Sequence, residues 1–505
     1  MSTLAVPAPE EGWRRLDKRT LLVTAAVMSG VAGGAGVPAA IGLAGGMGVG
    51  RALAWVLPAA LLLIAGGTGA DYVRWRRTRY RIGTDRAELH TGLLLVKRRS
   101  LGRERIRTVD LTANPLLRIL GLVKVRIGTG EHTGGESTLE LDPVTRAEGE
   151  LLRTELLGRA PAGADAGAHP EGMLSVLDPG WIRYAPLSFV APLMGGAAAG
   201  GVMQVGEWFG VQHEVLVWIG DRFRDTSILV TVVVLLAAAL LAGVVGSLGL
   251  WVEMWWNYRL EREPGGTLRV RRGLFTSRSV SIEERRLRGV ELVEPIGVRL
   301  VGAARVDAVA TGLTQDDDDK HTDLKTLLPA APKAVADEVA ARVLRETSSP
   351  TSAAGLTPHP LAARGRRLRW AVGAALVPVL VLVVLGLLVS DVMLPIAAAC
   401  GVVLVPIAVA LGLDAYRSLG HGLSGEYLIA RSGTVRRSTV ALQRGGVIGW
   451  TVKQSYFQRR AGLVTLTATT AAGEGAYHVR DAAEGEGLGF AGEAVPGLLE
   501  RFLEE

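Results

Sequence analysis

Three arginines, Arg118, Arg299 and Arg459, each stand three residues before a glycine, and their guanidinium groups could bind an anion. A planar guanidinium matches the geometry of phosphate. The alternative is an arginine at the surface beside a turn, or one paired with a carboxylate inside its own domain. We favour this second interpretation, in which the arginines have a structural role.

The arginine motif belongs to a pattern that occurs three times. In each copy a first glycine precedes a second by 29 residues, and the arginine lies three before the second. We expect tight turns with positive φ at the first glycines. The first two copies also share a Ser-(Leu/Ile)-x-x-x-Arg-(Ile/Leu) segment, from which the third departs. The repeated positions are Gly92, Arg105, Arg118 and Gly121; Gly273, Arg286, Arg299 and Gly302; and Gly433, Arg459 and Gly462.

Motifs that would indicate catalysis or a metal site are absent from the sequence. The eight histidines are scattered without a His-x-x-x-His pair, there is no P-loop, and Cys400 is the only cysteine. The string Gly487–Gly492 spells a dinucleotide fingerprint, but with 13 residues following it we attribute the match to chance. The acidic run Asp316–Lys320 lacks the spacing of an EF-hand loop, so we expect a solvated loop. We therefore predict no catalysis, no cofactor and no metal.

Six apolar stretches are long enough to cross a bilayer, which needs about 20 residues. They contain essentially no charged residue, and the connections pair them into three hairpins. We expect the first to remain in the mature protein rather than to be a cleaved signal peptide. Small residues four apart (Gly30/Gly34, Gly42/Gly46 and Gly196/Gly200) could form close helix-packing faces or contacts between copies of the chain, or could simply reflect abundant glycine. The stretches are roughly 20–45, 52–70, 185–206, 228–250, 371–390 and 392–413.

The basic residues lie mainly on one side of these stretches. Near the span ends 17 basic residues lie on the side of the polar blocks, and only Arg51, Arg222 and Arg224 lie at the hairpin tips. The positive-inside rule then places both termini and all polar blocks in the cytoplasm. The net charge of +7 thus reports orientation, and we expect no nucleic-acid partner.

Some of these arginines should also attract anionic lipid, by about 1 kcal/mol each. Orientation alone would explain them equally well, and the two interpretations are compatible. The predicted membrane-surface residues are Arg74, Arg76, Arg77, Arg79, Arg366, Arg367 and Arg369.

The chain is therefore three repeats of a hairpin followed by a polar block. Within a block, alternating runs such as 123–127 predict short strands. A closing helix is predicted around Leu152 and Leu156, around Val335–Val343, and around Leu498–Phe502. This order suggests a small curled sheet or barrel capped by a helix. The expected divisions are a cytoplasmic tail, 1–18; hairpin 1, 19–70; block one, 71–158; a linker, 159–180; hairpin 2, 181–250; block two, 251–346; a linker, 347–368; hairpin 3, 369–414; and block three, 415–505.

The aromatic and arginine segment after a hairpin (Trp75 to Tyr80; Trp255 to Tyr258), the glycine turns and the Arg-x-x-Gly motif resemble the membrane-flanked bacterial pleckstrin-homology-like (PH-like) family. The arrangement is similar to its three-copy, multi-pass members. The resemblance implies α+β or mainly-β domains, each a bent antiparallel barrel with a C-terminal helix. It also suggests a link to envelope stress or antimicrobial-peptide resistance.

The predicted function follows from these features. We expect a non-enzymatic, six-helix protein of the bacterial plasma (inner) membrane whose three PH-like domains bind proteins or the lipid surface. Its expected partners are membrane lipids and either other proteins or further copies of itself. The alternative is lipid or peptide transport or export by the six-helix bundle, although a bundle without intramembrane ionisable residues argues against coupled transport.

Overall fold

The computed structural model describes residues 12–92, 97–106, 108–128, 138–156, 172–311 and 325–499. Its contacts divide the chain into two compact units, Met1–Ile282 and Glu283–Glu505. The division falls inside block two, so the contact units do not follow the blocks. The acidic run Asp316–Lys320 lies outside the described residues.

Five helices in the described part of the chain are long and apolar enough to cross a membrane. A sixth span exists if the 3-10 helix Pro179–Leu187 and helix α5, Val190–Trp208, are counted together across a 68° bend. Helix α6 (Gln212–Arg222) occupies the tip of hairpin 2, where the sequence predicted only a connection. The five are α1 (Thr20–Met47), α2 (Val49–Arg77), α7 (Ile228–Trp255), α11 (Leu361–Leu388) and α12 (Met393–Arg417).

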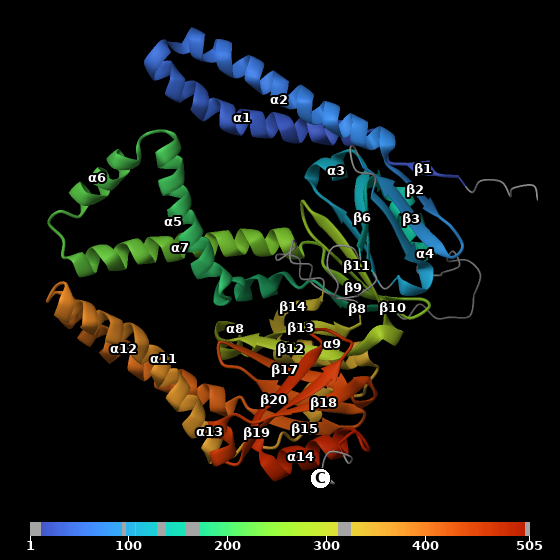
Figure 1. The fold of residues 1–505 in the computed structure, drawn as a ribbon, viewed down its shortest axis with the longest axis vertical. Helices are drawn as coiled ribbons and strands as arrows, with labels where there is room; N and C mark the ends of the chain where they lie inside the picture. Colours follow the sequence, from blue (N-terminus) through green and yellow to red (C-terminus); the bar gives the residue numbers. More distant parts are fainter. Residues whose placement is uncertain are drawn as a thin grey trace, which may run out of the picture. The chain divides into compact units, whose positions relative to one another are not determined.

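Helices of one hairpin lie side by side, as Figure 1 shows for α1 with α2 and for α11 with α12. The closest approach in hairpin 2 is at Gly195 and Gly243. A Cβ on Gly243 would lie 2.0 Å from the carbonyl oxygen of Ala191, so only glycine fits there. The predicted small-residue pairs at 30/34, 42/46 and 196/200 face open space within the chain, so they do not mediate this packing.

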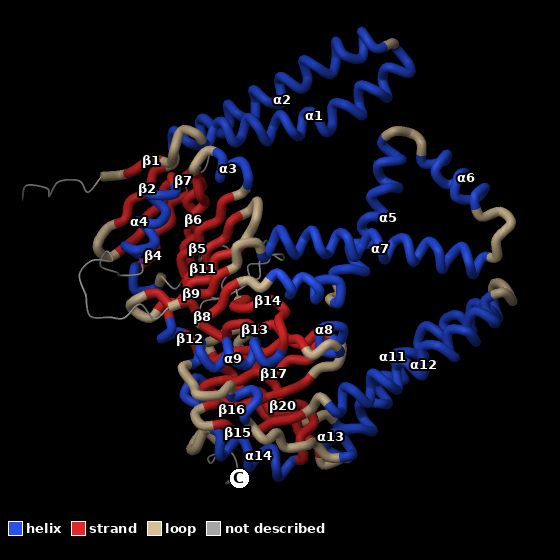
Figure 2. The backbone as a smooth tube through the Cα atoms, turned by 180° about the vertical axis from the view of Figure 1, so that it is seen from behind, coloured by secondary structure: helices blue, strands red, loops and turns tan. Residues whose placement is uncertain are grey.

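The strands of each block are divided between two sheets. The first strands of block one, with β1 from the N-terminal tail, form a four-stranded sheet. The last strands of block one join the first strands of block two in a seven-stranded sheet of order β7-β6-β5-β11-β10-β9-β8. Strands β5, β11 and β9 of this sheet are labelled in Figure 2. These strands are β1 (Arg14–Arg15), β2 (Arg79–Ile82), β3 (Arg86–Thr91) and β4 (Lys97–Gly102); then β5 (Thr108–Ala113), β6 (Leu122–Gly128), β7 (Thr138–Thr145), β8 (Met173–Val176), β9 (Arg259–Glu263), β10 (Thr267–Arg272) and β11 (Ser277–Glu283).

The same exchange recurs between blocks two and three. The last strands of block two join the first strands of block three in a six-stranded sheet, and the remaining strands form a three-stranded sheet. We call the β5–β11 joint the first seam and the β12–β17 joint the second seam. The strands are β12 (Leu287–Pro295), β13 (Ala303–Ala310), β14 (Thr326–Pro332), β15 (Gly420–Ser424), β16 (Tyr427–Ser432) and β17 (Arg436–Gln443); then β18 (Val447–Lys453), β19 (Leu463–Thr470) and β20 (Ala476–Ala483).

The two seams have the same register when the repeats are aligned on their glycines. Ala113 pairs with Ser277 in the first seam, and the equivalent residues Glu294 and Arg437 pair in the second. The segment before each hairpin also bonds to the first strand after it, for example Thr357 to His421. Strands thus enter the segments that the sequence suggested were tail or linker.

A closing helix follows the last strand of every block. These helices are α4 (Arg146–Leu156), α9 (Lys333–Leu344) and α14 (Glu484–Ala494). The third predicted position was wrong, because Leu498 and Leu499 follow the helix and Phe502 lies outside the described residues. The glycines of α14 lower its helix propensity and hid it from the sequence pattern. A Cβ on Gly487 would lie 3.1 Å from side-chain carbons of Val464 and Leu466, so glycine allows the helix to approach β19 closely. The string Gly487–Gly492, which spells the dinucleotide fingerprint, lies within this helix.

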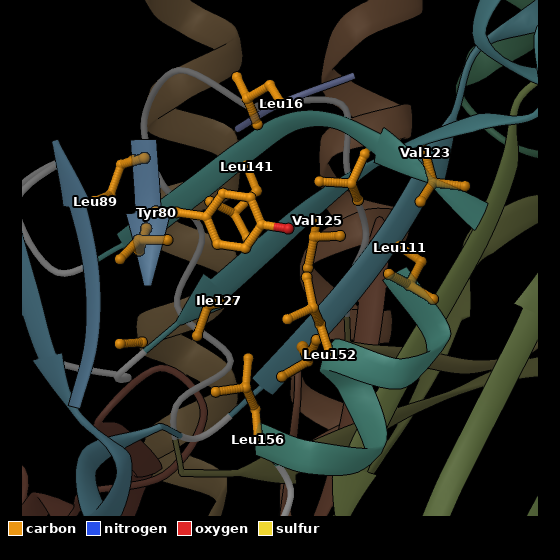
Figure 3. Packing of buried hydrophobic residues seen from close by; sticks show 14 of the residues in the cluster. Leu16, Tyr80, Leu89, Leu111, Val123, Val125, Ile127, Leu141, Leu152 and Leu156 are labelled. Atoms are coloured by element: carbon orange, nitrogen blue, oxygen red, sulfur yellow. The ribbon is translucent and has the colours of Figure 1, made fainter. Parts of the chain in front are cut away.

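The interior of block one shows what holds a block together. Tyr80 of β2 is fully buried, and Val125, Leu141 and Leu152 are buried with it. Figure 3 shows these side chains meeting between the strands and α4. Alternation along the strands and the spacing of α4 direct apolar side chains to this one interior.

Candidate functional site

The Arg-x-x-Gly motif forms the same local structure in all three blocks. The arginine is the next-to-last residue of a short helix, α3 (Pro115–Ile119), α8 (Ile296–Leu300) or α13 (Tyr456–Arg460). The second glycine follows with φ of +70°, +69° and +61° for Gly121, Gly302 and Gly462. Its carbonyl accepts a hydrogen bond from the first residue of the closing helix, at 3.0, 2.9 and 3.0 Å. The second glycine of the motif therefore fixes the position of the first residue of the closing helix.

The first glycines form the predicted turns with positive φ, +149° at Gly92, +114° at Gly273 and +107° at Gly433. A Cβ on Gly273 would lie 1.9 Å from the carbonyl oxygen of Thr276, which excludes other residues. The turn of block two is also fixed to a span, because the Glu253 carboxylate of α7 accepts the N–H groups of Phe275 and Thr276 at 2.9 Å each.

The motif arginines have different partners. Arg118 donates to the carbonyl oxygen of Leu274, and Arg299 binds the carboxylate of Asp414 at 2.7 Å. Arg459 is exposed, and no partner is found for it among the described residues. Arg118 and Arg299 thus join each motif to the following repeat, whereas the sequence interpretation expected a surface position or a carboxylate partner inside the same domain.

The arginines of the Ser-(Leu/Ile)-x-x-x-Arg segment can be compared only in part. Arg286 is buried and binds Glu283 at 2.8 Å, at the turn between β11 and β12. Arg105 lies in the equivalent 3-10 turn, but its side chain is outside the described part of the structure.

A network of buried ion pairs crosses the first seam. Arg153 of α4 binds Glu263 of β9 at 2.9 Å, and Arg269 of β10 binds Glu150 of α4 at 2.6 Å. Arg269 also donates to Glu263 at 3.1 Å and to the Ser279 hydroxyl at 2.8 Å. Burial alone would raise the pKa of the Glu263 carboxyl, but the hydrogen bonds and charges of the two arginines lower it. The closing helix of one repeat is thereby bound to the sheet of the next.

Beside this network lies a cavity of about 410 Å3, the seam cavity. Its walls come from β5, β6, α3 and α4 of block one and from β9, β10 and β11 of block two. Seven arginines and one acidic residue, Glu150, line it. Asn257, also in the lining, has φ of +53°, a conformation that asparagine tolerates better than most residues.

A second polar cluster lies in the unit formed by residues 283–505. Asp481 is fully buried with φ of +60°, and its carboxylate accepts from Arg366, from Arg367 at 2.6 Å and from Gln458 at 2.8 Å. Two of the predicted membrane-surface arginines are thus bound inside the protein. Sequence inspection missed Asp481, because no local pattern marks an aspartate whose two arginine partners lie more than 110 residues away.

Two buried histidines adjoin Asp481. Nδ1 of His359 lies 3.1 Å from the Asp481 carbonyl oxygen, and Nδ1 of His421 lies 3.0 Å from Nε2 of His359. The carbonyl can only accept, so His359 is protonated on Nδ1 and accepts from His421 on Nε2. Burial and the neighbouring His359 lower the pKa of His421 to about 4, and burial also lowers the pKa of His359.

The other predicted membrane-surface arginines lie at span ends. Arg74 is half exposed and pairs with Asp71 at 3.1 Å. Exposed arginines follow it at the end of α2 and the start of β2, and one more lies in α11; these are Arg76, Arg77, Arg79 and Arg369. Their affinity for anionic lipid remains a prediction.

Within the described ranges, no group of three or more His, Cys, Asp or Glu side chains could hold a metal ion.

Comparison with known proteins supports the repeat and the membrane location. The family model described as bacterial PH domain matches three segments, residues 37–160, 215–347 and 372–488. The chain is 23% identical over 415 residues to the UPF0699 transmembrane protein YdbT of Bacillus subtilis (strain 168), covering 79% of this chain and 81% of that protein. No solved structure matches. This chain is a membrane protein that belongs to the bacterial PH domain family and carries three copies of the domain.

Proposed function

We propose that the chain is a non-enzymatic protein of the bacterial plasma membrane whose PH-like domains bind the lipid surface and protein partners on the cytoplasmic side. The excess of basic residues on the block side of the spans supports this orientation. Envelope stress or defence against antimicrobial peptides is the setting we propose for these interactions, on the basis of the family resemblance.

The observation that carries the proposal is an exposed apolar side chain on each of the three short helices. Ile119 of α3 is 81% exposed, Leu300 of α8 is 80% exposed and Phe457 of α13 is 70% exposed. Ile119 and Leu300 directly follow a motif arginine, and Phe457 precedes Arg459 by two residues. An apolar side chain next to a cation is typical of a segment that inserts shallowly into a lipid interface.

Each short helix is connected to the end of a span. Arg19, directly before α1, donates to the carbonyl oxygen of Leu120 at the end of α3 at 2.9 Å. Arg299 of α8 binds Asp414 near the end of α12. Phe457 of α13 lines a groove of about 460 Å3 with the first turns of α11. These connections support a position for all three helices at the level of the membrane surface.

Depth measurement tests the proposal. Cys400 is the only cysteine, so a Cys400→Ser background allows a single nitroxide label at Ile119→Cys in reconstituted bilayers. We expect this label to be accessible to oxygen and protected from a water-soluble nickel chelate. The control is Ile448→Cys on β18, which is 64% exposed and should show the opposite pattern. Equal accessibility at the two sites would refute lipid contact by α3.

Interaction and transport are separated by two further measurements. Photo-crosslinking of the full chain in native membranes should capture protein partners. Proteoliposomes containing the purified chain should not move lipid or peptide across the membrane. Measured movement would favour the transport alternative over a binding role.

A further inference from the structure

The seam cavity holds more positive charge than its own carboxylates neutralise. The carboxylates of Glu150 and Glu263 already form ion pairs with Arg153 and Arg269. Six other arginines line the cavity, and four of them have no carboxylate partner among the described residues. Of the remaining two, one donates to a backbone carbonyl and the other stacks over Trp255 at 4.3 Å. The four are Arg146, Arg259, Arg271 and Arg278.

In the second seam, a carboxylate of the chain itself compensates the basic residues. Glu294 stands where the first seam has Ala113, eight residues before the second glycine of its repeat. It is buried, binds Arg437 at 2.7 and 2.8 Å, and lies 3.9 Å from Lys333. The first seam has Arg146 at the position of Lys333 and alanine at the position of Glu294, while serine replaces Arg437 and an arginine, Arg278, stands one residue later. Among the described residues of the first seam, no carboxylate takes the place of Glu294.

We propose that the seam cavity binds a phosphate-bearing anion in the place that Glu294 occupies in the second seam. Guanidinium groups donate paired hydrogen bonds to phosphate oxygens, and a cavity lined by one sign of charge concentrates ions of the other. A volume of about 410 Å3 accommodates a phosphate ester. Like-charged arginines held together without a counter-ion repel one another, and such a ligand would relieve this repulsion.

The position of the cavity is compatible with two sources of this anion. Asn257 lies two residues after the end of α7, and the N–H of Gly273 bonds to the Trp256 carbonyl oxygen at 2.8 Å. The cavity is thus adjacent to the end of a candidate span, within reach of a lipid headgroup. A soluble phosphate ester offers the same chemistry, so the experiment separates the two.

The test uses the full chain in nanodiscs. In one arm, neutral phosphatidylcholine discs are titrated with inorganic phosphate and glycerol 3-phosphate, and binding is measured by calorimetry. In the other, discs contain phosphatidylglycerol, and retained lipid is counted by native mass spectrometry. Ala113→Glu supplies the internal carboxylate of the second seam, and Arg278→Ser supplies the equivalent residue of that seam, Ser438. Arg86→Gln, an exposed arginine on β3, is the charge-matched control.

Binding in either arm that both seam variants weaken about tenfold or more, while Arg86→Gln leaves it unchanged, supports the proposal and identifies the source. No binding in either arm would overturn it. Binding that neither seam variant changes would also overturn it, as would an equal loss in Arg86→Gln. If Ala113→Glu fails to fold, as judged by its thermal transition, Arg278→Ser alone decides the outcome, because Arg278 is half buried without a carboxylate partner among the described residues.

Discussion

At the scale of single residues, Asp481 is the clearest example of a charge that the fold requires. Its carboxylate is fully buried and compensates two guanidinium groups from the start of α11, while Gln458 donates a further hydrogen bond. A buried ion pair contributes little net stability, but removing one partner leaves the other charge uncompensated.

We therefore expect Asp481→Asn to lower the free energy of unfolding of the 283–505 unit by about 3–5 kcal/mol. Asparagine keeps the backbone conformation with positive φ, so the change isolates the charge. Thermal unfolding of the purified chain in detergent would measure it. The control is Glu338→Gln, an exposed i,i+4 partner of Arg342, with an expected effect of at most about 0.5 kcal/mol. Equal shifts in both variants would contradict this account.

The buried histidine pair predicts a dependence on pH. Burial holds the pKa of His421 at about 4 in the folded chain, below the value of about 6.5 expected when unfolded. At pH values between about 4 and about 6.5, His421 is protonated to a greater extent in the unfolded chain than in the folded chain. The free energy of unfolding should thus fall as the pH drops from about 6.5 towards 4, by up to about 3 kcal/mol from His421.

Denaturation of the wild type and of His421→Gln at pH 7 and pH 5 would check this dependence. Asp481 and Glu486 favour a proton on His359, so the pair should accept its first proton there. The variant should lose less stability than the wild type on acidification. If both proteins lose the same free energy of unfolding between pH 7 and pH 5, the histidine pair does not change its protonation on unfolding.

At the scale of elements, the seams decide how the repeats cooperate. Gly289 of β12 faces β17, and a Cβ there would lie 1.9 Å from the carbonyl oxygen of Ala441. The glycine therefore allows two strands from successive blocks to reach hydrogen-bonding distance in the second seam.

Gly289→Ala should open the second seam and lower the free energy of unfolding of this unit by about 1–3 kcal/mol, since the strands must separate or shift. Amide hydrogen exchange should rise in β12 and β17 together. Gly445→Ala is the control, because open space surrounds a Cβ at that position. Unchanged exchange in both strands would show that the seam tolerates the methyl group.

At the scale of the whole molecule, the first seam bears on the number of membrane crossings. Strands β5 and β11 can pair only if blocks one and two lie on the same side of the membrane. Helix α7 is the most apolar candidate span, and if it crosses the membrane we expect one further crossing between these strands. The bent segment of residues 179–208 can supply that crossing, which favours six spans.

Reporter fusions test this topology. A reporter that is active only in the periplasm should be inactive after residue 158 and after residue 346, and active at Asp391 in the tip of hairpin 3. Equal expression of the fusions, checked by immunoblot, is the control. Activity after residue 346 would contradict a cytoplasmic location for block two. Activity after residue 158 as well would then indicate the inverted orientation, and its absence there would indicate an odd number of crossings between the two fusion sites.

The sequence by itself determined the features that depend on local patterns. Runs of apolar residues defined the five long spans, and the 29-residue glycine spacing defined the three turns, which all have positive φ. Alternation identified strands such as β6 and β19. The glycine-rich α14 was misplaced, because its helix is stabilised by packing against β19 and β20 rather than by propensity.

Only the tertiary structure decided which edges pair and which charges meet. One edge of β5 pairs with β6 of its own block, but nothing in the local pattern of β5 indicates that its other edge pairs with β11, more than 160 residues away. The same holds for Asp481 and for the contrast between Ala113 and Glu294, whose importance depends on the residues across a seam. Hydrogen bonding and charge compensation act through space, so they are fixed only when the repeats have folded against each other.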